Sequence, residues 1–67
     1  MTDVQVKMAC EYLRAKAARL GADIEVRHAV DDVFVLYRAG QPHRLCRISL
    51  EDSEEKFKRY VLCLMED

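Results

Sequence analysis

The chain has little of what builds a cross-linked, metal-bound or membrane-spanning protein. Its 67 residues include three cysteines, one proline, two glycines and no tryptophan. Cys10, Cys46 and Cys63 are odd in number and form no C-x-x-C pair, which argues against a disulfide framework or a structural zinc site. No apolar run approaches the length needed to cross a bilayer. We therefore expect free thiols, no metal, no cofactor and no membrane contact.

The motifs of catalysis are also missing. Gly21 and Gly40 stand alone, so the chain has no glycine-rich phosphate loop. The histidines are expected in unreactive places, His28 on the inner face of a strand and His43 in a turn. A pair of Cys46 and His28 would activate a thiolate only with a third orienting group, and none can be assigned. We expect that the protein is not an enzyme.

Composition and charge describe one small globular domain over residues 1–67. The chain is 51% hydrophobic and 34% charged, with a net charge of −1, so no global field attracts nucleic acid or membrane. Asp3 lies where a secretory leader would carry positive charge, and we expect a soluble protein of the reducing cytoplasm. A core this small rarely supplies more than roughly 3–5 kcal/mol, so a partner would add useful stability.

Helical periodicity occurs at both ends of the chain. The spacing predicts a helix over residues 3–20, which begins with a capping box at Thr2 and Gln5 and ends at Gly21. A second helix is predicted from an N-cap at Asp52 or Ser53 to about residue 65. The main apolar stripe of the first helix consists of Val6, Cys10, Leu13, Ala17 and Leu20. A lesser stripe consists of Val4, Met8, Tyr12 and Ala15, and it is either a broadly buried face or a partner contact.

Strand periodicity fills the middle of the chain. Residues 24–30 alternate between apolar and polar and predict one strand. A second strand is predicted from Val33 to Arg38 or Ala39, and its run over residues 33–37 is apolar on both faces. Residues 44–50 form a third predicted strand after a turn at 39–43. The predicted fold class is α+β, a two-layer α-β-β-β-α domain. In it, a three-stranded antiparallel meander is covered by both helices on one face.

The turns then set the register of the strands. A first loop centred on Asp31 and Asp32 and a second loop over residues 40–43 direct Phe34 and Leu36 away from the helices. The resulting outward face has an apolar centre and an arginine rim, which is typical of an interaction surface. The predicted partner-binding residues are Arg27, Phe34, Leu36, Arg38, Leu45 and Arg47.

Two functions are compatible with this pattern. The first is a small protein-interaction module, either a homodimer or a regulatory or inhibitory subunit of a larger assembly. The alternative is a nucleic-acid-binding module in which Phe34 stacks on a base while Arg27, Arg38 and Arg47 hold phosphates. Three structural alternatives stay open: a register slip of one residue, one helix on each face of the sheet, or arginine stems that merely cover the apolar centre.

The order of elements is also that of the double-stranded-RNA-binding domain, but the residues differ. That family carries a lysine cluster at the start of its last helix, where this chain has Ser53, Glu54 and Glu55. Its first hairpin loop is also longer than Asp31 and Asp32 allow. We therefore do not assign the chain to that family.

Overall fold

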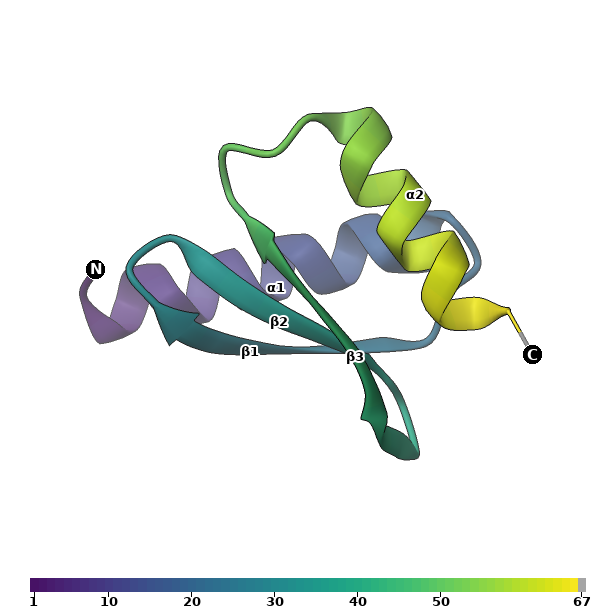
Figure 1. Ribbon diagram of the computed structural model, residues 1–67. Helices are drawn as coiled ribbons and strands as arrows, with labels where there is room; N and C mark the ends of the chain where they lie inside the picture. The colour runs from purple at the N-terminus through teal and green to yellow at the C-terminus, as the bar shows by residue number, and fades with distance from the viewer. Residues whose placement is uncertain (67) are drawn as a thin grey trace.

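The computed structural model describes residues 1–66 and has the predicted order of elements. Helix α1 (Asp3–Arg19) is followed by strands β1 (Ile24–Val30), β2 (Val33–Arg38) and β3 (Gln41–Ser49), and the described part ends with helix α2 (Glu54–Met65). The strands form one antiparallel sheet in the order β1-β2-β3. Figure 1 shows this arrangement, which confirms the small α+β fold predicted from the sequence.

The helix ends have the predicted chemistry. The Thr2 side chain accepts the backbone N–H of Gln5, and the Gln5 side chain accepts that of Thr2, so the capping box is complete. Gly21, with φ of 77°, takes the left-handed conformation that commonly ends a helix. Of the two predicted N-caps of α2, Ser53 caps the helix through the backbone N–H of Lys56. Within residues 1–66, no helix combines the length and apolar character needed to span a membrane.

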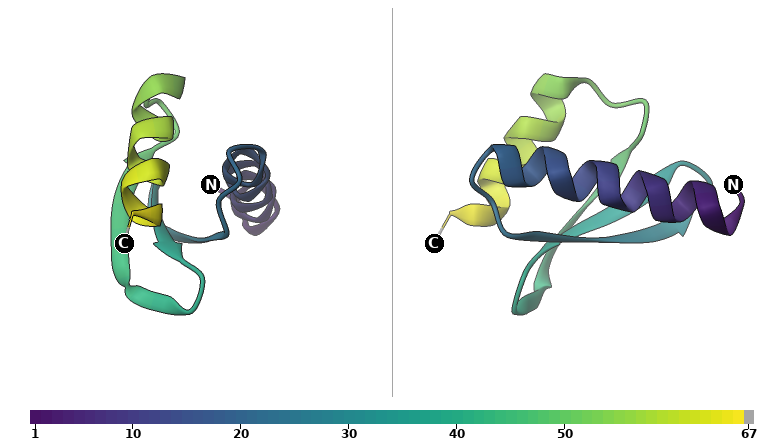
Figure 2. Two further views of the ribbon diagram at one scale, coloured as in Figure 1. Left: turned by 90° about the vertical axis from the view of Figure 1, so that its right-hand side faces the viewer. Right: turned by 180° about the vertical axis from the view of Figure 1, so that it is seen from behind.

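The core is one buried cluster that combines side chains of both helices with side chains of all three strands. Leu13 and Ala17 of α1 and Phe57, Val61 and Leu64 of α2 belong to the same buried cluster. The sheet contributes Ile24 and Val26 from β1, Phe34 and Leu36 from β2, and Ile48 from β3. α1 lies behind the sheet in Figure 1 and in front of it in the rear view of Figure 2.

The first hairpin corrects the predicted register. Val30 does pair with Val33 across the turn at Asp31 and Asp32, but the register shifts between His28 and Val30. Beyond this bulge, His28 pairs with Phe34 and Val26 with Leu36, where the loop length had predicted Val35 and Tyr37. The bulge adds one residue to β1, which moves β2 by one position and exchanges its two faces.

In the second hairpin, the observed register of β2 and β3 also differs from the predicted one by one residue. Its turn consists of Ala39 and Gly40 alone, because Gly40, with φ of 80°, permits a tight reversal. Strand β3 therefore begins at Gln41, earlier than predicted, and its register shifts between the Arg38 and Tyr37 pairs. As a result Leu36 pairs with Cys46, the residue that had been predicted opposite Tyr37.

These two shifts turn Phe34 and Leu36 into core residues. Both side chains are 0% exposed. The prediction that they face outward was therefore wrong. Their places on the outward face are taken by their neighbours Val33, Val35 and Tyr37, which are partly buried.

Candidate protein interface on the outer sheet face

The outer face is the side of the sheet that points away from the buried cluster of Phe34, Leu36 and Ile48. Residues that pair across neighbouring strands point to the same side, so the register assigns the members of this face. One row runs from Glu25 through Tyr37 to Leu45, and the next runs from Arg27 through Val35 to Arg47. The row at the first turn consists of Val30, Val33 and Ser49.

Half of the predicted binding residues lie on this face. Arg27, Leu45 and Arg47 have outer register positions and are exposed, as predicted. Phe34 and Leu36 are in the core, and Arg38 occupies the inner register position opposite Ile24 and Gln41. The structure adds Val33, Val35 and Tyr37 of the central strand. The larger apolar bulk of Phe34 and Leu36, together with the tyrosine hydroxyl, was the signal in the sequence that favours this orientation.

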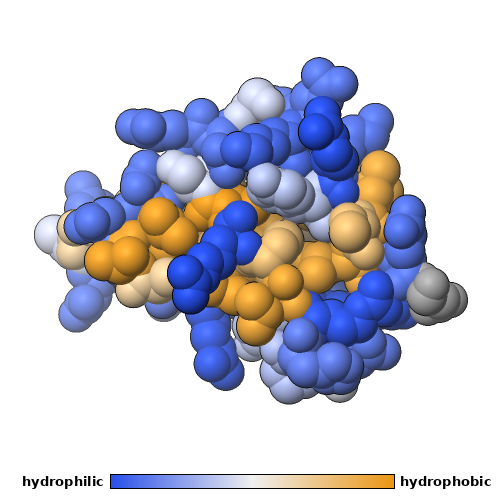
Figure 3. All heavy atoms as spheres, in the orientation of Figure 1, coloured by the Kyte–Doolittle hydropathy of each residue, from blue (hydrophilic) through white to orange (hydrophobic). Residues whose placement is uncertain are grey.

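Apolar side chains form a band across the outer face. Val30 and Leu45 remain 59% and 52% exposed. Figure 3, which has the orientation of Figure 1, shows the apolar band running across the sheet, with hydrophilic side chains crossing and flanking it. On the central strand, Val33, Val35 and Tyr37 have outer register positions. An apolar patch with a polar rim is typical of a protein-binding surface.

Charged side chains of the two edge strands border this band. The Arg27 guanidinium lies over the Tyr37 ring, 5.3 Å from its centroid. Arg47 lies in the same row on the opposite edge strand, so Val35 has an arginine on each side. Glu25 precedes Arg27 by two residues along β1 and forms an ion pair of 3.5 Å with Arg14 of α1. The face therefore carries both signs of charge around an apolar centre.

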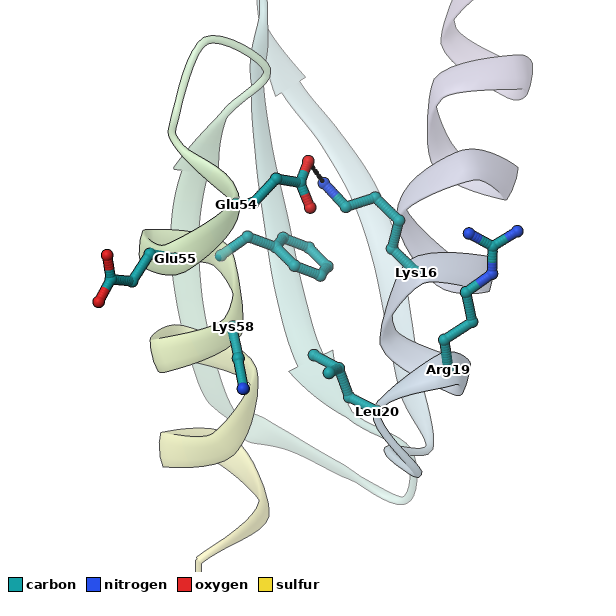
Figure 4. Close-up of a pocket in the computed structure, with 7 residues that line it drawn as sticks. Lys16, Arg19, Leu20, Glu54, Glu55 and Lys58 are labelled. Atoms are coloured by element: carbon teal, nitrogen blue, oxygen red, sulfur yellow. Dashed lines mark hydrogen bonds and ion pairs between the residues drawn. The ribbon is translucent and has the colours of Figure 1, made fainter.

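The two helices also border a pocket, and two of its charged side chains pair with each other within the fold. The pocket lies between the end of α1 and the start of α2 and is lined by Lys16, Arg19, Leu20, Glu54, Glu55, Phe57 and Lys58. Figure 4 shows Lys16 and Glu54 pointing toward one another across it, and their charged groups are 2.7 Å apart. Lys16 thus joins the two helices.

His28 and Cys46, the pair considered from the sequence, have different surroundings. His28 contacts the Asp31 carbonyl through Nε2 at 2.7 Å, and its ring lies 5.0 Å from that of Phe34. Burial raises the pKa of the Cys46 thiol to about 11, and the nearby Cys63 adds to the rise. Cys10, Cys46 and Cys63 are free thiols. Within the described part of the chain, no cluster of three metal-ligating side chains occurs.

A smaller apolar surface lies on α1. Val4, Met8 and Tyr12 of the predicted lesser stripe are exposed, so this stripe is not part of the core. Lys16, one turn further along the helix, lies 5.1 Å from the Tyr12 ring centroid. The stripe is narrow and follows a single helix face, whereas the outer face of the sheet spans three strands.

Comparisons of the chain with protein-family models, curated proteins and solved structures give no match.

Proposed function

We propose that this protein is a small non-enzymatic interaction module that binds another protein chain, a second copy of itself, through the outer face of its sheet. The observation that carries the proposal is the central strand. Val33, Val35 and Tyr37 of β2 have register positions that face away from the core, and both helices contribute side chains to the buried cluster that contains Phe34 and Leu36. A partner that covers this face would therefore come from outside the monomer.

The chemistry of the face suits a specific interface. Arginine and tyrosine are enriched where proteins bind one another, because each combines a large contact area with directional polar groups. Here the Arg27 guanidinium already lies over the Tyr37 ring, which limits the freedom of both side chains before binding. Burial of Val30 and Leu45 would add apolar area that the monomer leaves in water. The same surface would also serve a regulatory subunit that joins a different protein.

A second copy is the occupant that the charges favour. The face carries Glu25 next to Arg27, so a copy of the same face offers a carboxylate for a guanidinium and the reverse. A twofold interface needs this self-complementarity, and a net charge of −1 for the chain causes little repulsion between copies.

Sedimentation equilibrium over a wide range of concentrations tests the proposal. We expect the parent to dimerise and Val35→Asp to be monomeric but folded, because a carboxylate at the centre of an interface is costly to desolvate. Val4→Asp on α1 is the matched control and should leave dimerisation unchanged. A parent that is monomeric at millimolar concentration would contradict the homodimer, and capture of a different protein would then identify the regulatory form.

One observation favours nucleic-acid binding as a second candidate. Tyr37, in place of the predicted Phe34, is an aromatic side chain on the outer face, with Arg27 over its ring and Arg47 on the neighbouring strand β3. Proteins that bind single strands combine such stacking and phosphate contacts. Binding of a labelled oligonucleotide should then weaken steeply with salt and be reduced by Tyr37→Leu. A lack of binding at low salt would exclude this candidate.

A further inference from the structure

We propose that the two copies stack outer face on outer face about a twofold axis that runs across the strands, so that Glu25 of each copy meets Arg27 of the other. This inference rests on the proposed self-association and specifies its geometry. The partner is a second copy of the chain, and the contact is recognised by two reciprocal ion pairs around an apolar centre.

The spacing of charges along β1 determines where the axis passes. Glu25 and Arg27 are two residues apart, so both point outward in adjacent rows of the sheet. A twofold axis perpendicular to the strands, midway between these rows, places β1 of one copy over β1 of the other in the reverse direction. Glu25 then lies over Arg27 of the other copy, and symmetry repeats the contact once more.

The same axis also brings together compatible residues of β2 and β3 from the two rows. On β2, Tyr37 of one copy lies over Val35 of the other, and on β3 Arg47 lies over Leu45. The aromatic ring thus meets an apolar side chain, and the arginine stem covers an exposed leucine. Stacked sheets lie about 10 Å apart and cross at about 30°, a separation and offset that the long arginine side chains can span.

Other twofold axes across this face bring like charges together. An axis parallel to the strands places β1 over β3 of the other copy, which sets Arg27 against Arg47 within their common row. An axis perpendicular to the strands but centred on that row sets each of these arginines against itself. Like-charge contacts within an interface are unfavourable, so the axis between the two rows is preferred.

Glu25 is available for this contact. Its ion pair with Arg14 is solvent-exposed, since the two side chains are 43% and 50% exposed. Exposed pairs of this kind contribute little to stability, so the carboxylate can turn toward a second guanidinium at low cost. Arg27 is exposed as well, and its contact with the Tyr37 ring holds it above the face where the other copy would bind.

Charge exchange between the two positions tests the geometry by sedimentation equilibrium. Glu25→Arg alone creates two arginine–arginine contacts per dimer, and Arg27→Glu alone creates two glutamate–glutamate contacts. We expect each to weaken self-association by about tenfold or more. An equimolar mixture of the two variants restores both ion pairs in a heterodimer, so it should associate nearly as tightly as the parent.

The controls separate this geometry from an effect of net charge. Glu55→Arg and Lys58→Glu make the same changes of charge on α2, and neither should weaken the dimer. The double variant Glu25→Arg/Arg27→Glu should dimerise like the parent. If the parent dimerises but neither the mixture nor the double variant regains affinity, the proposed axis is wrong while the proposed function stands. A parent that does not dimerise would overturn both. Circular dichroism of each variant establishes that the monomer stays folded.

Discussion

The ammonium of Lys16 lies 2.7 Å from a carboxylate oxygen of Glu54 and 4.4 Å from the centroid of the Phe57 ring. This one side chain of α1 therefore binds both a charged and an aromatic residue of α2. The Lys16 side chain is only 15% exposed, whereas that of Glu54 is 77% exposed. The contact with the ring is consequently the better shielded of the two.

Replacement of Lys16 should weaken the domain more than replacement of Glu54. Lys16→Met keeps an apolar stem but removes the cation, and we expect a loss of about 1–2 kcal/mol in the free energy of unfolding. Glu54→Gln leaves the ammonium over the ring and should cost under about 1 kcal/mol. Urea titrations followed by circular dichroism measure both values. Equal losses would show that the ion pair, and not the ring contact, joins the helices.

The two faces of β2 should respond differently to truncation. Phe34→Ala removes a fully buried ring and should cost about 3–5 kcal/mol, enough to unfold much of a domain of this size. Val35→Ala, the neighbouring position on the outer face, should change the stability of the monomer by less than about 1 kcal/mol. Thermal melts at a concentration below dimerisation compare the variants. The reverse order of stabilities would mean that the register is wrong by one residue.

The first turn contains a position that glycine would suit better. Asp31 has φ of 51°, a left-handed conformation that costs most residues energy and aspartate somewhat less. Asp31→Gly should stabilise the protein by up to about 1 kcal/mol. Asp32→Gly is the matched control and should destabilise, because the Asp32 carboxylate accepts the Ser49 hydroxyl at 2.8 Å. Melting temperatures that move in the opposite directions would contradict this account of the turn.

The cysteines should react with alkylating reagents in a fixed order. The pKa of Cys46 is raised from 9.0 to about 11, so at neutral pH its reactive thiolate is scarcer than in an ordinary cysteine. Cys63 is exposed, and we expect it to react with iodoacetamide before Cys46. The rate at Cys46 should rise about tenfold per pH unit until the pH approaches 11. Mass spectrometry of timed samples measures each site, and equal rates in the native protein at pH 8 would contradict the prediction.

The buried sides of the helices and of the edge strands β1 and β3 could be predicted because their apolar residues are periodic. The stripe through Leu13 and Ala17 identifies the buried side of α1, and alternation along β1 separates Val26 from Arg27. The alignment of β1 with β3 was also correct, since Val26 and Cys46 lie in one row in both the prediction and the structure. The first two features depend only on the sequence within one element. The alignment of β1 with β3 depends on the combined register shift of the two hairpins, which is zero.

The orientation of β2 could not be predicted in the same way. An unbroken apolar run such as Val33 to Tyr37 has no period of two, so only the turns determine which side is buried. Each register differs from the expected one by a single residue. In the first hairpin the cause is a bulge near Ala29, and in the second it is a tighter reversal at Gly40 combined with three extra residues of β3 between the Arg38–Gln41 and Tyr37–Leu45 pairs. The two shifts move β2 in the same direction relative to its neighbours. Only its two faces were therefore exchanged, and half of the predicted interface went with them.

The link between Lys16 and Glu54 has a consequence for the rates of folding and unfolding. The two residues are 38 positions apart in the chain, whereas each strand pairs with its neighbour across a tight turn. Contacts that are local in sequence form quickly, while the closure of a long loop is slower. We expect the meander to form before α1 and α2 come together, with the lysine contact made after the transition state. Its loss would then accelerate unfolding and leave the folding rate nearly unchanged, so the lysine contact would lengthen the lifetime of a folded molecule without making it fold faster.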